Sequence, residues 1–188
     1  FIAKLDSNGN YLWAKRAGST SIDEGKGITS FSDGSSIITG YFAGSAEFGS
    51  TTLTSAGDKD IFVAKLDSSG NFLWATKAGG ASGDNGNAIN ALSDGNSIIT
   101  GDFSGSATFG STTLTSAGDK DIFVAKLDSS GNFLWATKAG GTGSEYSNGI
   151  TTIPNGSSIV TGYFDDSATF GSTTLNNVGG KDIFVAAL

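Results

Sequence analysis

The sequence repeats itself with a strict period. Residues 60–80 and 121–141 share the same 21 letters, DIFVAKLDSSGNFLWATKAGG. Four phenylalanines spaced 61 residues apart begin the matching segments FIAKL, FVAKL, FVAKL and FVAAL, namely Phe1, Phe62, Phe123 and Phe184. A fixed period of this size is typical of a tandem array of supersecondary units. We therefore expect one repeat domain over residues 1–188, with units 1–61, 62–122 and 123–183 and a fourth unit beginning at 184–188.

Each unit is predicted to be all-β. Apolar, β-branched stretches alternate with short clusters of Asp, Ser, Gly and Asn, which favour tight turns. No stretch has the i, i+3, i+4, i+7 spacing of an amphipathic helix. The chain's only proline, Pro154, falls in one of the predicted turns, a position that accepts proline where a central strand would not. The strands expected in the second unit are 62–67, 72–79, 86–92 and 97–103, followed by a small hairpin at 106–118.

A four-stranded antiparallel unit repeated in tandem describes the blade of a β-propeller. We assign 86–92 to the inner strand of a blade, 97–103 to the second, the DIFVAKLD segment to the third and the NFLWATKAG segment to the outer strand. The expected fold class is all-β, a β-propeller-like array of three four-stranded blade repeats.

Closure of this array is not obvious from the sequence. Propellers close with roughly 4–8 blades, and three blades leave apolar faces uncovered at both ends. Three arrangements remain open: the chain belongs to a longer parent, it associates with copies of itself through its end blades, or it closes as a threefold β-trefoil-like fold. The first and last segments, FIAKL and FVAAL, are copies of the same third strand, so one of them is surplus on simple closure.

The repeated segments also predict the core. We expect the large apolar residues of the third and outer strands to be mostly buried, in equivalent surroundings in each unit: Phe62, Val63, Leu66 and Trp74, and Phe123, Val124, Leu127 and Trp135. Phe1 and Phe184 are expected to contribute less, because only one of the duplicated terminal strands can take the regular third-strand position.

The repeat resembles a known family. The pattern DIFVAKLDSSGNFLWA, a Gly-rich step and then SDGNSIITG is similar to the SBBP (seven-bladed β-propeller) repeat of bacterial proteins, above all the versions in secreted Bacteroidetes proteins. The resemblance covers the whole chain and implies a propeller-like fold in a secreted or cell-surface protein, often one exported by type IX secretion. It implies no particular activity, because the family is defined by its fold. The chain departs from the family in copy number, with three units and not seven.

Composition argues against several kinds of partner and of catalytic or metal site. The net charge is −7, which argues against nucleic acid as a partner, and no apolar run approaches the ~20 residues that span a bilayer. His and Cys are both absent, so serine–histidine triads, histidine-ligated metals, disulfides and thiolate zinc sites are impossible. The chain does not begin with Met, as expected of a processed product or an excerpt of a longer protein.

Three aspartates are the candidate metal ligands. Asp6, Asp67 and Asp128 recur once per unit in LDSNGN or LDSSGN turns, which resemble part of a calcium loop in their oxygen-rich composition. These turns lack the further acidic residues of such a loop, so the alternative is a turn held together by Asp and Asn side chains.

Two other features bear on ligand binding. The tryptophans of the outer strands could stack on sugars, as in propeller lectins, or pack between strands. The segments 20–26, 81–87 and 142–148 differ between units and lead into the inner strands, where the loops of a propeller face its ligands.

The function expected from these observations is a non-catalytic secreted or cell-surface scaffold for interactions, such as adhesion. A glycan-binding, lectin-like propeller is the alternative, and a carboxylate-dependent enzyme acting on polysaccharide is a third reading. No catalytic residue is predicted, and no cofactor other than the candidate calcium. The expected partners are further copies of the chain or the rest of a longer parent, and surface glycans or proteins.

Overall fold

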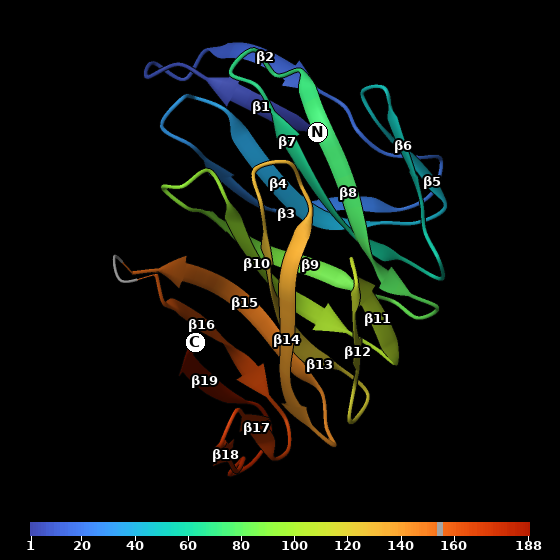
Figure 1. Cartoon of the computed structure of the whole chain (residues 1–188), viewed down its shortest axis with the longest axis vertical. Coiled ribbons are helices and arrows are strands. Elements are labelled where there is room, and N and C mark those ends of the chain that lie inside the picture. The colour runs from blue at the N-terminus through green and yellow to red at the C-terminus, as the bar shows by residue number, and fades with distance from the viewer. Residues whose placement is uncertain (154–155) are drawn as a thin grey trace.

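The computed structural model describes residues 1–153 and 156–188, and within them it contains strands and turns without α-helix (Figure 1). The predicted turn position of Pro154 lies outside the described residues. The strands of the first half are β1 (Ile2–Leu5), β2 (Tyr11–Lys15), β3 (Asp23–Ser30), β4 (Ser36–Phe42), β5 (Ser45–Phe48), β6 (Thr51–Thr54), β7 (Asp60–Leu66), β8 (Phe72–Gly80) and β9 (Asn85–Ala91). The second half contains β10 (Ser97–Phe103), β11 (Ser106–Phe109), β12 (Thr112–Thr115), β13 (Asp121–Leu127), β14 (Phe133–Gly141), β15 (Glu145–Thr152), β16 (Ser158–Phe164), β17 (Ala168–Phe170), β18 (Thr173–Leu175) and β19 (Asp182–Ala187).

The strands form a propeller-like array. Two complete blades have the order β3-β4-β7-β8 and β9-β10-β13-β14, with all neighbours antiparallel. A third blade has the three strands β15-β16-β19, and β1 and β2 form a separate hairpin at the other end. This is the predicted order of inner, second, third and outer strands. The blades lie side by side along the long axis, with the two termini on different end blades, so the array is open and is not a closed threefold barrel (Figure 1).

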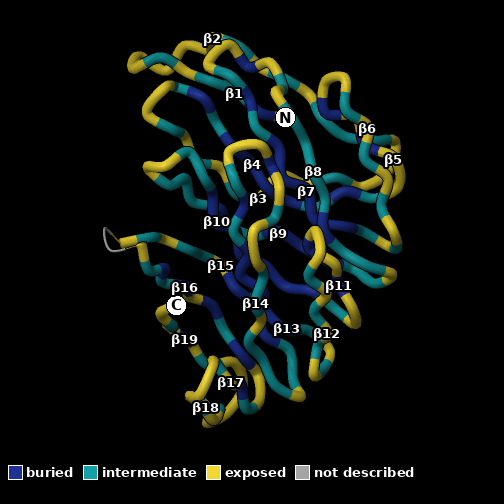
Figure 2. The backbone as a smooth tube through the Cα atoms, in the orientation of Figure 1, coloured by how far each residue is buried: buried dark blue, intermediate teal, exposed yellow. Residues whose placement is uncertain are grey.

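Successive blades pack face to face through three apolar clusters. Because alternate side chains of a strand point to opposite faces, Phe62 and Leu66 join the cluster against β1–β2, whereas Val63 joins the cluster against the second blade. A third cluster, which includes Val124 and Phe184, joins the second and third blades. The buried segments run through the middle of the stack, and the turns at its edges are exposed (Figure 2). Strand β10 is buried along its whole length, as its largely apolar sequence predicts, and this burial includes its polar residue Asp102.

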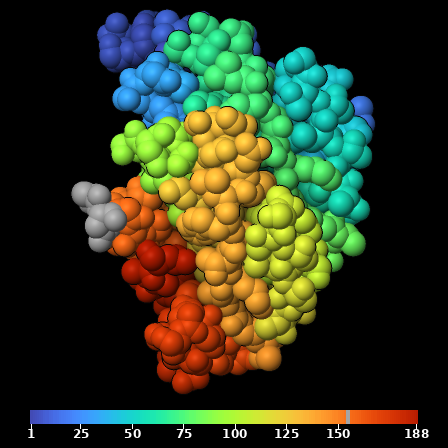
Figure 3. Space-filling model, viewed as in Figure 1, coloured from blue at the N-terminus to red at the C-terminus, as the bar shows by residue number. Residues whose placement is uncertain are grey.

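The small hairpins reach back to the preceding blade. In chain order β11–β12 belongs to the second blade, but β11 pairs with the end of β8 in the first, through Ala107↔Gly80 and Thr108↔Gly79. Likewise β17 pairs with the end of β14. On the surface the β11–β12 hairpin lies beside the outer strand β14 (Figure 3). Each hairpin therefore ties two neighbouring blades together.

The tryptophans connect each outer strand to the next blade. Trp74 Nε1 donates to the backbone oxygen of Ser129 at 3.1 Å, and Trp13 Nε1 donates to that of Ser68 at 3.3 Å. The prediction that Trp135 is mostly buried is wrong: it is 39% exposed, because no turn of the described residues packs on it as the Ser129–Gly131 turn packs on Trp74. Trp74 is half-buried.

The terminal phenylalanines differ from each other. Phe1 is 96% exposed, as expected of a surplus strand, but Phe184 is only 1% exposed, so the prediction that it contributes less to the core is wrong. Strand β19 occupies the regular third-strand position beside β16, and this places Phe184 in the same surroundings as Phe123. The other six predicted core residues, Phe62, Val63, Leu66, Phe123, Val124 and Leu127, are all buried.

Candidate ligand-binding rim

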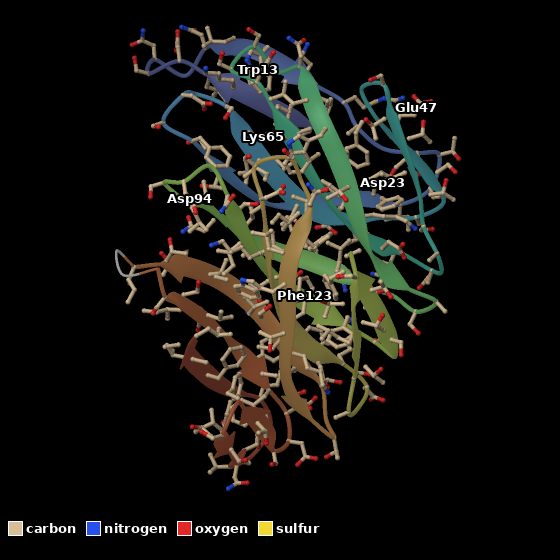
Figure 4. The ribbon with its side chains drawn as sticks, in the orientation of Figure 1. Trp13, Asp23, Glu47, Lys65, Asp94 and Phe123 are labelled. Atoms are coloured by element: carbon tan, nitrogen blue, oxygen red, sulfur yellow. The ribbon has the colours of Figure 1, made fainter. Side chains whose placement is uncertain are left out.

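One edge of the array carries the segments 20–26, 81–87 and 142–148, which differ between repeats. The inner strands begin there, the second strands end there and the third strands begin there. Asp23 and Glu47 lie at this edge, and Asp94, in a turn between inner and second strands, lies at the opposite one (Figure 4). We call the following set the variable rim: Glu24, Tyr41 and Lys59 in the first blade, Asn85, Asp102 and Lys120 in the second, and Tyr146, Tyr163 and Lys181 in the third.

In the second blade the rim is built around a buried carboxylate. Asp102 is 2% exposed and accepts hydrogen bonds from Asn85 Nδ2 and Asn87 Nδ2, both at 2.8 Å. Lys120 Nζ forms an ion pair with Asp102 Oδ2 at 2.7 Å. Burial alone would lower the pKa of Lys120, but the hydrogen bond and charge of Asp102 more than offset it and raise that pKa. All of these contacts to the Asp102 carboxylate come from the protein's own side chains. The carboxylate therefore stabilises the second blade and is not free to bind a ligand.

In the first blade the same positions carry a tyrosine and a glutamate. The Tyr41 hydroxyl donates to Glu24 Oε2 at 2.8 Å, and this hydrogen bond raises the pKa of Tyr41. The ammonium groups of Lys59 and Lys26 lie 4.3 and 5.4 Å from the centre of its ring. A depression of about 470 Å³ lies beside this ring, between Ile22 and Lys59.

The third blade presents two tyrosines. The rings of Tyr146 and Tyr163 are stacked, with centroids 4.8 Å apart and planes at 27°. Lys181 Nζ lies 4.2 Å from the Tyr163 centroid. Both rings are half-buried, so each keeps part of its surface open to solvent.

Polar contacts of rim residues and their neighbours join all three blades at this edge. Lys26 Nζ of the first blade donates to Asn87 Oδ1 at 3.1 Å, and Asn87 Nδ2 donates to the backbone oxygen of Ser147 in the third blade at 3.0 Å. Lys120 of the second blade also lies 5.1 Å from the Tyr146 ring. The rim is therefore one connected surface of tyrosines, lysines and amides.

Pairs of carboxyl groups lie beneath the rim at each blade junction. Asp60 of β7 and Asp84, just before β9, crowd the same glycine: a Cβ on Gly79 would lie 2.8 Å from Asp60 Cγ and 2.9 Å from Asp84 Oδ2. Asp121 and Glu145 crowd Gly140 in the same way. Lysines on the outer strands pair with one member of each, Lys77 with Asp60 at 3.2 Å and Lys138 with Asp121 at 2.6 Å.

Burial favours the protonated form of the other carboxyl group in each pair, which is Asp84 in one and Glu145 in the other. Asp84 and Glu145 are inaccessible to solvent, and burial raises the pKa of each to about 7. Their backbone hydrogen bonds, from Gly80 to Asp84 at 2.8 Å and from Gly141 to Glu145 at 3.0 Å, act in the opposite direction. These carboxyls hold the start of each inner strand against the end of the preceding outer strand, and they titrate near neutral pH.

The three calcium candidates lie in exposed hairpin turns at different blades. In each turn the carboxylate accepts two backbone N–H groups and one Asn side chain: Asp67 accepts Ser69 N at 2.9 Å, Asn71 N at 2.8 Å and Asn71 Nδ2 at 2.9 Å. Asp6 and Asp128 make the same three contacts. Hydrogen bonds from the Asn lower the pKa of all three groups. Over residues 1–153 and 156–188 no group of three or more Asp or Glu residues is arranged to hold a metal ion. Calcium binding by these residues stays a prediction.

The rim tyrosines and Asp102 were not singled out from the sequence. The sequence does show variation at this position: GYF, GDF and GYF occupy one repeat position and differ only in the middle letter. Sequence alone did not reveal that this position lies beside the variable segments 20–26, 81–87 and 142–148, because that proximity depends on how the blades pack.

Comparison with known proteins gives limited similarity. No protein-family profile matches the chain. The uncharacterized WD repeat-containing protein L264 of Acanthamoeba polyphaga mimivirus is 26% identical over 226 aligned positions, covering 97% of this chain and 16% of that protein. The chain thus spans about one sixth of this relative's length, and the similarity to a WD-repeat protein agrees with a propeller-type fold. A crystal structure of a protein of unknown function from Bacteroides caccae has 14% identity and a TM-score of 0.46, covering 93% of this chain and 53% of that one.

The described residues contain no helix that is long and apolar enough to cross a membrane.

Proposed function

We propose that this chain is a β-propeller scaffold module of a secreted or cell-surface bacterial protein, and that it binds its partners through the variable rim. The observation that carries the proposal is where the repeats differ. Residues 60–80 and 121–141 are identical, yet Asn85 and Asp102 are followed one period later by Tyr146 and Tyr163, beside a lysine that is kept (Lys120 and Lys181). Exposed positions that vary on one connected surface, close to segments repeated without change, are where partner specificity is expected.

The extracellular placement is supported by the resemblance of the repeat to SBBP repeats, and the absence of Cys is compatible with it. The acidic net charge of −7 is also compatible with it. Fusion of the chain to a reporter, followed by fractionation of the bacterial cell, tests this placement.

Glycan binding is a second candidate for the rim. Half-buried Tyr146 and Tyr163 present aromatic faces, and neighbouring lysines and amides supply hydrogen-bond donors, which is the chemistry that holds a sugar ring. The outer-strand Trp74 is less suited to this role, because its indole N–H is already bonded to Ser129.

A non-catalytic role is favoured over hydrolysis of polysaccharide. A glycosidase needs two accessible carboxyl groups on either side of the substrate. Asp60, Asp84, Asp121 and Glu145 are at most 1% exposed, and they bond to the protein's own lysines and backbone.

The rim is tested by binding to an array of immobilised polysaccharides and surface proteins. Tyr163→Ala and Tyr41→Ala are expected to weaken retention, and Leu73→Ala is the control because Leu73 is exposed near the start of β8, away from the rim. Equal binding by all three variants would place the ligand elsewhere. Retention on protein spots alone would favour the scaffold over the lectin.

A further inference from the structure

The third blade has an unpaired edge where the other two blades have an outer strand. In the second blade β14 pairs along β13, from Ile122↔Ala139 to Leu127↔Phe133. The equivalent strand β19 pairs with β16 on one side, and none of the described strands pairs with its other side. A strand edge of this kind is a template for pairing with a further strand.

A cavity lies beside this edge. It has a volume of about 280 Å³ and is lined mainly by apolar residues, among them Ile122, Val124, Val160, Phe170 and Leu188. Gly171 also lines it, and a Cβ built there would meet no atom within 4 Å.

The equivalent positions in the other junctions hold an aromatic ring. Phe133 packs edge-on against Phe109 at 5.7 Å, and Phe72 packs edge-on against Phe48 at 6.0 Å. A Cβ on Gly110 would lie 3.2 Å from Phe133, and one on Gly49 would lie 3.1 Å from Phe72. The cavity beside Gly171 is therefore the seat of the first aromatic residue of an outer strand.

The whole face of the third blade is uncovered in the same way. Ile183 and Val185 are 80% and 70% exposed, whereas their equivalents in the second blade, Ile122 and Val124, are 2% and 3% exposed. The exposed side chains of this face are of the same kind as those that the chain buries at the junctions between its own blades.

The opposite end of the chain carries the matching parts. Strand β1 has the same sequence pattern as β19, and Ile2 stands one period before Val63, at the position of Val185. Ile2 packs into the cluster of the first blade, although Phe1 beside it is exposed. Strand β2 begins with Tyr11, at the position of Phe72 and Phe133, and Tyr11 is 69% exposed.

We propose that a second copy of this chain docks on the third blade, with its β2 pairing along β19 and its Tyr11 in the cavity beside Gly171. Strand β19 takes the place of β1 of the second copy, and Val185 takes the place of that copy's Ile2. The Tyr hydroxyl can stay hydrated, because Phe72 and Phe133 in the equivalent seats are only half-buried. The contact is head-to-tail, and two copies joined at both ends form a ring of six four-stranded blades, within the range in which propellers close.

Light scattering over a range of concentrations tests the proposal with the intact chain. We expect a dimer of twice 18.9 kDa. Tyr11→Ala should raise the dissociation constant about tenfold or more, as loss of a buried aromatic anchor does, and the control Leu73→Ala, at a residue of β8 that is 56% exposed, should leave it within about twofold. A monomer at every concentration, or equal effects of the two variants, would overturn the proposal.

Two further measurements separate this contact from other kinds of association. A variant lacking residues 1–5 should dimerise more tightly, because β1 no longer competes with β19. A synthetic peptide of residues 7–18 should dissociate the dimer into monomers, and a scrambled peptide should not. A dimer that the residue 7–18 peptide leaves intact is held by another surface and contradicts the proposal, even if the truncated variant fails to fold.

Discussion

Phe123 on β13 lies directly opposite Gly101 on β10, and its ring covers the place where a side chain at Gly101 would stand. A Cβ on Gly101 would be 2.7 Å from Phe123 Cε1 and would also meet the backbone oxygen of Asn85. The same relationship joins Gly40 with Phe62 and Gly162 with Phe184. In each blade the glycine of the ITG or VTG triplet therefore packs directly against the ring of the core phenylalanine.

Truncating these phenylalanines should destabilise the fold. Phe62→Ala, Phe123→Ala and Phe184→Ala should each lower the free energy of unfolding by about 3–5 kcal/mol, because each removes a fully packed ring from a core. Phe1→Ala is the matched control and should change it by less than about 0.5 kcal/mol, since Phe1 is 96% exposed. Urea unfolding followed by tryptophan fluorescence measures all four. A loss for Phe184→Ala close to that for Phe1→Ala would mean that β19 does not hold its place.

Adding a single methyl group to the glycine should also be costly. Gly101→Ala is expected to lower stability by about 1–3 kcal/mol, because the ring of Phe123 and the backbone of β9 must both shift. Gly25→Ala is the control: its φ is not positive and a Cβ there meets no atom within 4 Å. Thermal unfolding of both variants gives the comparison, and equal melting temperatures would contradict the packing described for Gly101.

Stability should depend on pH near neutrality. The pKa values of Asp84 and Glu145 in the folded chain are about 7, above the ordinary 3.8 and 4.5, so the folded state binds these two protons more tightly than the unfolded state. The resulting stabilisation is complete below about pH 4 and is lost as the pH rises through 7. The chain should therefore melt at a higher temperature at pH 5 than at pH 8.

The variants that isolate this effect are Asp84→Asn and Glu145→Gln, which keep the shape of the side chain and remove its titration. Each should flatten the pH dependence of the melting temperature between pH 5 and 8. The turn aspartates Asp6, Asp67 and Asp128 have lowered pKa values and stay ionised over this interval, so they do not contribute to it. A steep dependence that persists in the double variant would assign it to other groups.

The turn aspartates should stabilise the fold without a metal. Asp67→Ala is expected to cost about 1 kcal/mol in chelator, because three hydrogen bonds of the turn are lost. Differential scanning calorimetry with excess calcium and with excess chelator tests the other prediction for Asp6, Asp67 and Asp128. A melting temperature that rises with calcium, and does so less in Asp67→Ala, would identify them as calcium ligands.

The strand order of a blade could be predicted from the sequence because it depends on local signals. Turn residues separate the strands, and apolar alternation identifies them. The 61-residue period shows that each unit has the same arrangement of strands. Burial of Phe62 and Phe123 follows from the same pattern.

Features that depend on contacts between blades could not be predicted in this way. Nothing in the letters of residues 106–115 indicates that their hairpin pairs with Gly79 and Gly80 of the preceding blade. The exposure of Trp135 has the same origin, since an identical segment buries Trp74 more deeply only because Ser129 and Gly131 follow it in the next blade. The rim network likewise joins Lys26, Asn87 and Ser147 from three separate units.

The backward-reaching hairpins give the chain an order of assembly as it leaves the ribosome. When residues 106–115 emerge, the outer strand that they bind, β8, is already complete, and the third strand of their own blade is not yet made. Ala107 meets Gly80 only 27 residues back along the chain (107 − 80), so this pairing does not wait for a distant partner. Short loops of this kind keep the entropy cost of each closure low, which favours rapid folding in an all-β protein and shortens the time that a bare strand edge is exposed to neighbouring chains.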